Sequence, residues 1–190
     1  MSKLKNISTL FFLLVAFSVL NLSSHTQAAE WSGGFVSGHL TWGVGSGSSS
    51  IATTAASQWN GASSKASYTY SSGSNQYGST AQVVTHFNSI NAPLSGDLGV
   101  MYPYKTWTGT SATSATLSDT WVKAMVYQYK TTLLDTDTKR TATATHEMGH
   151  ALSMAHPPGE STLSIMVQGV KTDYSIQLYD RLSLQQKWGK

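Results

Sequence analysis

The chain has 190 residues, of which 40% are hydrophobic and 11% aromatic, with 12 basic residues against 9 acidic residues and no cysteine. This length fits one globular domain, and the apolar content is sufficient for a core, which argues against a globally disordered chain. The lack of cysteine excludes disulfide bonds, cysteine-ligated zinc, a thiol nucleophile and a cysteine-based latency switch. Serine and threonine together account for 52 residues, so hydroxyl groups rather than ions make the chain polar.

The first 29 residues have the pattern of a secretory signal peptide. Lys3 and Lys5 precede an apolar run at 10–20, and small residues follow it. Such a run is well short of the roughly 20 residues that a membrane-spanning helix needs. Cleavage after Ala28 and cleavage after Ala29 both fit the pattern. We therefore expect a secreted, extracellular protein with a signal peptide at 1–29 and one domain at 30–190.

The positive charge of the chain belongs mostly to this leader. Its removal leaves ten basic against nine acidic residues, a net charge of +1, and Lys139-Arg140 is then the longest basic cluster. A nucleic-acid-binding protein would carry a much larger basic patch. We expect a monomer without a nucleic-acid partner, and a mature form that is not attached to a membrane.

The remaining residues show helical and strand patterns in turn. Apolar residues recur at helical spacing from Ile51 to Ala62, with Ser49 or Ser50 as the N-cap. Strand patterns follow at 66–70, 81–87, 98–102 and 121–129, the last of them apolar on both faces, and helical patterns at 141–153 and 176–188. This order predicts an α+β or α/β layered domain.

The sequence HEMGHALSMAH at 146–156 carries the chemistry. On a helix, His146 and His150 lie one turn apart on one face, so their imidazoles can bind one metal ion. Zinc needs a third protein ligand, and a catalytic site leaves the fourth position to water. His156 supplies the third ligand only if the helix ends before it. Pro157 follows at once and disfavours helical geometry at His156.

Glu147 neighbours the ligand face without belonging to it. It can accept a proton from water that the metal activates and deliver the proton to a leaving amine. The motif therefore predicts hydrolysis of a peptide bond without a covalent intermediate. A serine hydrolase is disfavoured, because no G-x-S-x-G surrounds any serine.

The motif, together with Ser164-Ile165-Met166, resembles the metzincin zinc proteases, and among them most closely the matrixin catalytic domain. The resemblance implies one catalytic zinc, a general base and a methionine floor beneath the metal in a "Met-turn". These roles fall on His146, His150 and His156 as ligands, on Glu147 as the base and on Met166 as the floor. The implied fold is a twisted, mostly parallel sheet with a cleft-lining edge strand, a zinc-site helix and a C-terminal helix.

The resemblance also assigns regions of the chain. It places the strand 121–129 at the edge that lines the cleft, the segment 179–189 in the last helix, and the segment 167–174 in the wall of the pocket for the residue after the scissile bond. Ser153 stands where the family usually has glycine. A left-handed conformation there costs a non-glycine residue roughly 1–2 kcal/mol, which suggests a turn of different shape.

Further metal sites find little support in the sequence. Asp135 and Asp137 are the only close acidic pair, and we interpret them as a turn or helix N-terminus. A calcium loop at this pair stays open as an alternative without further support. His39 and His86 are interpreted as ordinary strand or loop histidines.

The predicted function is that of a secreted, zinc-dependent endopeptidase acting on proteins or peptides. Two alternatives remain open. The first is a secreted binding protein that keeps the zinc for structure only, in which case Glu147 would have no role as a base. The second is a zinc amidase that acts on cell-wall peptides, which the motif does not exclude.

Overall fold

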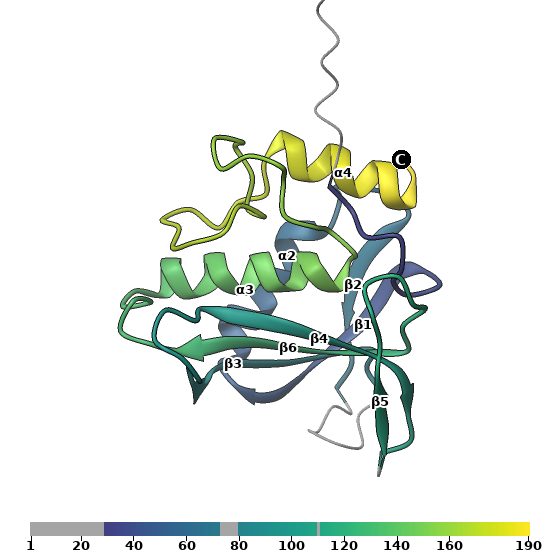
Figure 1. The fold of residues 1–190 in the computed structure, drawn as a ribbon, viewed down its shortest axis with the longest axis horizontal. Coiled ribbons are helices and arrows are strands. Elements are labelled where there is room, and N and C mark those ends of the chain that lie inside the picture. Colours follow the sequence, from purple (N-terminus) through teal and green to yellow (C-terminus); the bar gives the residue numbers. More distant parts are fainter. Residues whose placement is uncertain (1–28, 73–79, 110) are drawn as a thin grey trace, which may run out of the picture.

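The structure is a computed structural model that describes residues 29–72, 80–109 and 111–190 (Figure 1). Residues 1–28 of the expected signal peptide lie outside the described part. Within it, no helix combines the length and apolar character required to cross a membrane. The described elements are β1 (Gly38–Gly47), α2 (Ser49–Trp59), β2 (Ala66–Tyr70), β3 (Val83–Asn91), β4 (Gly99–Trp107), β5 (Ala112–Ser114), β6 (Lys123–Lys130), α3 (Asp137–Ala151) and α4 (Leu178–Trp188).

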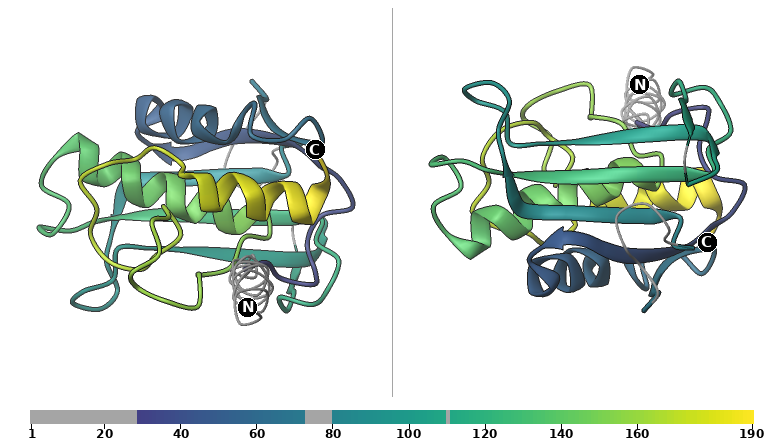
Figure 2. Two further views of the ribbon diagram at one scale, coloured as in Figure 1. Left: turned by 90° about the horizontal axis from the view of Figure 1, so that it is seen from above. Right: turned by 90° about the horizontal axis from the view of Figure 1, so that it is seen from below.

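The strands form one six-stranded sheet in the order β2-β1-β3-β6-β4-β5. The pairs β1–β2, β1–β3 and β3–β6 are parallel, whereas β4 is antiparallel to both β6 and β5. In the described part, the helices lie on one face of the sheet, with α3 against it and α4 beyond α3 (Figures 1 and 2). The predicted layered α/β fold with a mostly parallel sheet is confirmed.

The prediction that the strand 121–129 lies at the edge of the sheet is wrong. That strand is β6, which lies inside the sheet between β3 and β4. An internal position agrees with its sequence, because Met125 faces one side, Val126 faces the other, and both are buried. The strand beside the cleft is β4. Its first half has a free edge, because β5 pairs with β4 only from Tyr104 onward.

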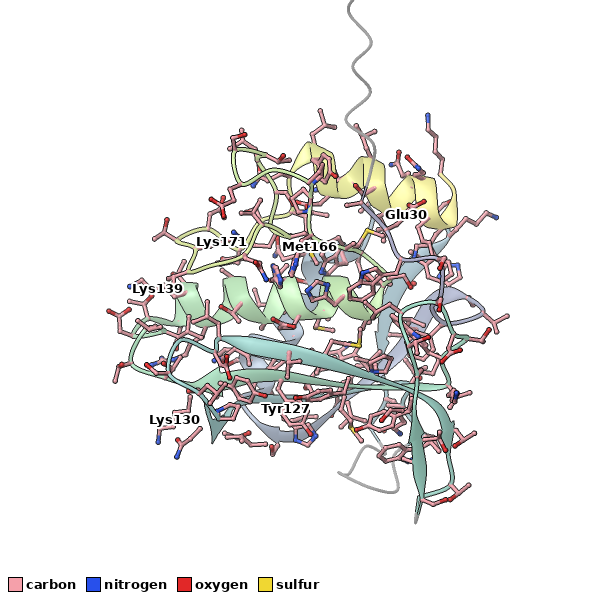
Figure 3. The ribbon with its side chains drawn as sticks, viewed as in Figure 1. Glu30, Tyr127, Lys130, Lys139, Met166 and Lys171 are labelled. Atoms are coloured by element: carbon pink, nitrogen blue, oxygen red, sulfur yellow. The ribbon has the colours of Figure 1, made fainter. Side chains whose placement is uncertain are left out.

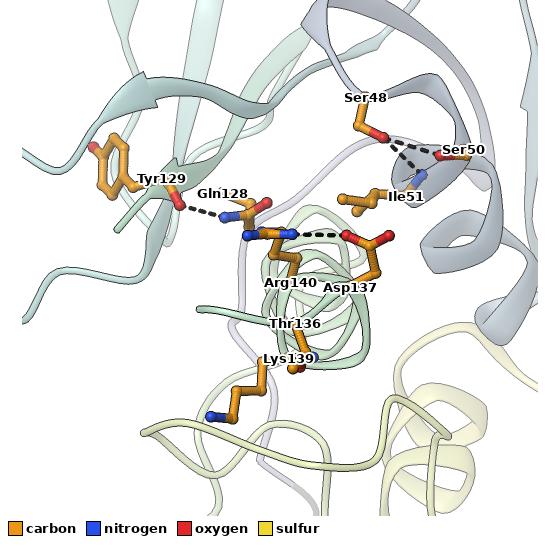
Figure 4. Close-up of polar contacts among 9 residues, drawn as sticks. All are labelled: Ser48, Ser50, Ile51, Gln128, Tyr129, Thr136, Asp137, Lys139 and Arg140. Carbon is orange, nitrogen blue, oxygen red and sulfur yellow. Dashed lines mark hydrogen bonds and ion pairs between the residues drawn. The ribbon is translucent and has the colours of Figure 1, made fainter. Parts of the chain in front are cut away.

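Two helices begin at side-chain caps (Figure 4). The hydroxyl of Ser48 accepts the N–H of Ile51 at 3.3 Å, so α2 is capped one residue before the predicted Ser49 or Ser50. Helix α3 is capped by Thr136, whose hydroxyl accepts the N–H of Lys139 at 3.3 Å, and it starts four residues before the predicted Thr141. Satisfying these free N–H groups stabilises each helix end.

The acidic pair before α3 belongs to this helix N-terminus. Asp135 pairs with Lys139 at 2.8 Å. Asp137, in the first turn, pairs with Arg140 at 2.8 Å (Figure 4). Carboxylates near a helix N-terminus are favoured by the helix dipole. The interpretation of these residues as a helix N-terminus is confirmed.

The second half of α3 is held by hydrogen bonds from two neighbouring elements. The indole N–H of Trp59 in α2 donates to the carbonyl of Thr145 at 3.0 Å, and the hydroxyl of Tyr68 in β2 donates to the carbonyl of Met148 at 2.7 Å. All residues of α3 from Thr141 to Ala151 are buried. The sheet, α2 and these bonds therefore fix α3 in place.

Helix α3 ends in a left-handed residue. After Ala151 and the C-cap Leu152, Ser153 has a φ of +66°, so the chain turns sharply without glycine. Ser153 is fully buried, and its hydroxyl has no hydrogen-bond partner among the described residues. Ser153, where the matrixins that the motif resembles usually have glycine, thus combines backbone strain with a buried polar group.

Replacing Ser153 should stabilise the protein in two separable steps. Ser153→Ala removes only the buried hydroxyl, and we expect about 1 kcal/mol of added unfolding free energy. Ser153→Gly also relieves the left-handed strain, worth roughly 1–2 kcal/mol, of which about 0.5–1 kcal/mol is offset by the entropy of glycine in the unfolded chain. Urea unfolding of the three proteins measures both steps. A glycine variant less stable than the alanine variant would contradict the strain at this residue.

Candidate active site

The three predicted histidines come together at one point. His146 and His150 lie one turn apart on α3, and the turn at Ser153 brings His156 back beside them. The Nε2 of His156 is 3.1 Å from the Nε2 of His146 and 3.1 Å from the Nε2 of His150. Among the described residues, these three histidines form a group of side chains that could hold one metal ion.

Backbone carbonyls set the protonation of two of these rings. The Nδ1 of His146 is 2.9 Å from the carbonyl oxygen of Ile165, and the Nδ1 of His150 is 2.8 Å from that of Met154. A carbonyl only accepts hydrogen bonds, so both Nδ1 atoms carry the proton and both Nε2 atoms present a lone pair. Metal-bound histidines in proteins are oriented by partners of this kind.

A metal ion fits this donor set. The lone pairs of His146 and His150 both point at the Nε2 of His156, whose single proton can satisfy only one of them. Tetrahedral ligands at roughly 2.05 Å from zinc lie about 3.3 Å apart, close to the observed separations. A cation at this point would satisfy all three nitrogens.

Burial shifts the pKa values of the site. It lowers the pKa of His146 to about 4 and also lowers the pKa values of His150 and His156, because a charged imidazole loses its hydration there. The rings are therefore neutral at neutral pH, which is the form that binds metals. Burial also raises the pKa of the Glu147 carboxyl to about 8. At neutral pH the metal-free group therefore holds its own proton, and a cation bound nearby would favour the carboxylate, which is the form that can act as a base.

Glu147 faces the start of β4. A Cβ atom added to Gly99 would lie 2.7 Å from the Cγ of Glu147 and 2.9 Å from its Oε1, so the strand approaches the carboxylate as closely as its backbone allows. Only glycine permits this approach. Gly99 was not predicted from the sequence, because the contact joins residues far apart in the chain.

Met166, the residue of the predicted Met-turn, packs against α3. Met166 is 2% exposed, and its sulfur lies against Gly149, where any side chain would collide with it. Gly149 stands between the candidate ligands His146 and His150 in the chain, so Met166 contacts α3 beside them. Figure 3 shows Met166 above α3, on the side that faces α4.

Asp180 anchors this turn and was missed by the sequence analysis. Its buried carboxylate accepts hydrogen bonds from the Ser164 hydroxyl and, at 2.9 Å, from the N–H of Ile165. It also accepts the N–H of Gln177 at 2.7 Å, at the start of α4. Because the carbonyl of Ile165 orients His146, Asp180 links the last helix to a candidate ligand. The one signal in the sequence is an acidic residue near the start of the helix predicted at 176–188.

A cleft of about 540 Å³ opens over the histidines and Glu147. Leu98 and the start of β4, from Gly99 to Met101, form one side of it. The predicted wall at 167–174 contributes Gln168, Gly169 and Lys171, and Figure 3 shows Lys171 on the loop above α3. Trp31 and Leu117 also line the cleft, and neither was predicted.

The chain was compared with known proteins in three ways. No family model matches it, and no curated protein does. A solved structure described as "Structure of myroilysin" is similar with a TM-score of 0.48 and 12% identity, over 83% of this chain and 96% of that one. Another, "Crystal structure of myroilysin", has a TM-score of 0.47 and 13% identity over 86% and 92% of the two chains.

Zinc binding should depend on His156. We expect His156→Ala to weaken zinc affinity at least about 100-fold, because two imidazoles remain where a zinc site uses three or four protein ligands. His39→Ala is the matched control, since His39 is exposed on β1 and contacts Ser67. Competition with a chromophoric chelator measures both affinities. Unchanged binding in His156→Ala would place the third ligand elsewhere.

Proposed function

We propose that this chain is a secreted, monomeric, zinc-dependent endopeptidase of the metzincin type, with its catalytic domain at 30–190. The observation that carries the proposal is the convergence of three neutral imidazole nitrogens beside a buried carboxylate in one open cleft. His146, His150 and His156 would hold one zinc ion. The resemblance of the motif and of Met166 to the matrixins supports the metzincin type.

The zinc ion would act as a Lewis acid that activates water and polarises the carbonyl of the scissile peptide bond. The chain's own part in the reaction falls mainly to Glu147. Its carboxylate takes the proton of the attacking water and returns it to the leaving nitrogen. Burial of this carboxylate keeps bulk water from competing for the proton.

The free edge of β4 supports a peptide as the substrate. Among the described residues, β4 pairs with β6 on one side only between Gly99 and Tyr102, and residues 99–101 line the cleft. An extended peptide can add to such an edge through main-chain hydrogen bonds, which hold any sequence in register. This edge would place a peptide bond beside Glu147.

The buried carboxylate also weighs against a purely structural zinc site. Glu147 is 6% exposed, and burial raises the pKa of its carboxyl. Burying such a group costs free energy, and a zinc ion that is bound only for structure does not require a carboxyl group beside it. A zinc amidase for cell-wall peptides uses the same chemistry, and the choice of substrate in the assay separates it from a general endopeptidase.

Glu147→Gln should abolish cleavage while zinc stays bound. Glutamine keeps the shape of the side chain but cannot accept the proton, so we expect kcat to fall at least about 100-fold. The assay uses zinc content together with cleavage of a denatured protein, a peptide library and purified cell-wall peptides. If the wild type binds zinc but cleaves no more than the variant, the protein is not a peptidase. Cleavage of cell-wall peptides alone would favour the amidase.

Gly99→Ala should lower turnover more than metal affinity. The added methyl group would meet the side chain of Glu147 and the carbonyl of Tyr127, displacing the base or the strand. We expect kcat to fall about 10-fold or more, since small misplacements of reacting groups are costly. The zinc affinity of Gly99→Ala should stay within about 3-fold of the wild type, because the hydrogen bonds that orient His146 and His150 are retained. Gly159→Ala, where a methyl group meets nothing closer than 3.9 Å, is the control. Equal kcat values for the two variants would contradict the close approach.

A further inference from the structure

The indole of Trp31 lies flat against a candidate metal ligand. Its ring centroid is 4.9 Å from that of His150, with 16° between the two planes. Trp121 contacts the same indole edge-on at 5.9 Å. Trp31 is half-buried, and its remaining surface lines the cleft. The N-terminal part of the domain thus touches a ligand that is supplied by α3.

The same segment also pairs with the residue that orients His150. The Nδ1–H of His150 donates to the carbonyl of Met154 at 2.8 Å, and Met154 forms an antiparallel bridge with Glu30. Two hydrogen bonds flank this bridge, from the N–H of Trp31 to Ser153 at 2.9 Å and from the N–H of Ala155 to Ala29 at 3.0 Å. Glu30 and Trp31 therefore fix the turn that follows α3.

Helix α4 holds this segment in place. The ammonium of Lys187 donates to the carbonyls of Trp31 at 2.6 Å, Ser32 at 3.2 Å and Gly33 at 2.9 Å. All three protons of an ammonium can be used in this way, and hydrogen bonds from a charged donor are stronger than neutral ones. Glu30 lies beside the same helix, with Gln186 donating to its carboxylate at 3.4 Å (Figure 3).

We propose that Trp31 is a positioning residue for His150 and that residues 30–33 form an integral part of the metal site. The hydrogen bond to Met154 fixes one edge of the imidazole but leaves the ring free to tilt about that contact. The flat indole removes this second freedom, so the Nε2 lone pair points at His156. This inference rests on the proposed function, because it concerns the same metal centre.

The test compares zinc affinity in Trp31→Ala, Trp31→Phe and the wild type. We expect about 10-fold weaker binding in Trp31→Ala, the lower range seen when an outer partner of a ligand is lost. Trp31→Phe keeps a flat ring and should stay within about 3-fold of the wild type. Trp107→Ala is the matched control, since Trp107 packs on Tyr104 at the far end of β4 and does not line the cleft.

Melting temperatures with zinc and with a chelator separate positioning from mere packing. A positioning role predicts a smaller zinc-induced rise in Tm for Trp31→Ala than for the wild type. An equal fall with and without zinc, at unchanged affinity, overturns the inference and leaves the proposed function intact. Equal loss of affinity in Trp31→Phe and Trp31→Ala also overturns it. A wild type that binds no zinc overturns the proposed metal centre and this inference together.

Discussion

The site depends on two hydrogen bonds in which backbone carbonyls accept the Nδ1 protons of His146 and His150. These carbonyls decide which nitrogen of each ring is free, so the fold, rather than the local sequence, creates the donor set. Burial keeps both rings neutral. The result is a helix face whose nitrogens have no adequate partner unless a cation is present, and that arrangement is costly without one.

The two carbonyls belong to two loops that are anchored in different ways. The Ile165 loop is tied by Asp180 to the start of α4. The Met154 turn is paired with Glu30, and Lys187 near the end of α4 holds the residues that follow. Helix α4 therefore supports both loops from its two ends, although none of its residues lines the cleft. Such outer support is what keeps ligand geometry precise.

The local part of this site could be predicted from the sequence, because helix periodicity places His146 beside His150 and Pro157 requires the helix to end before it. The sheet class could also be predicted, since strands with two apolar faces belong inside layered folds. Strand order could not be predicted, and the edge assigned to 121–129 was wrong, because neighbours in a sheet are chosen by contacts between distant segments. Gly99, Asp180 and Trp31 escaped prediction for the same reason: each acts on a residue far away in the chain.

The clamp between Lys187 and residues 31–33 joins the two ends of the described chain. A centre built from residues 30–33, 99, 146–156, 164–166 and 180 can form only after the chain has been made as far as α4 and has folded. Contacts between residues so far apart in the chain form slowly, because the chain loses the entropy of closing a long loop before the contact stabilises it. Binding of a metal ion would accordingly be a late event in folding. Under the proposed function, a chain that lacks α4 would have no competent site with which to cleave nearby proteins.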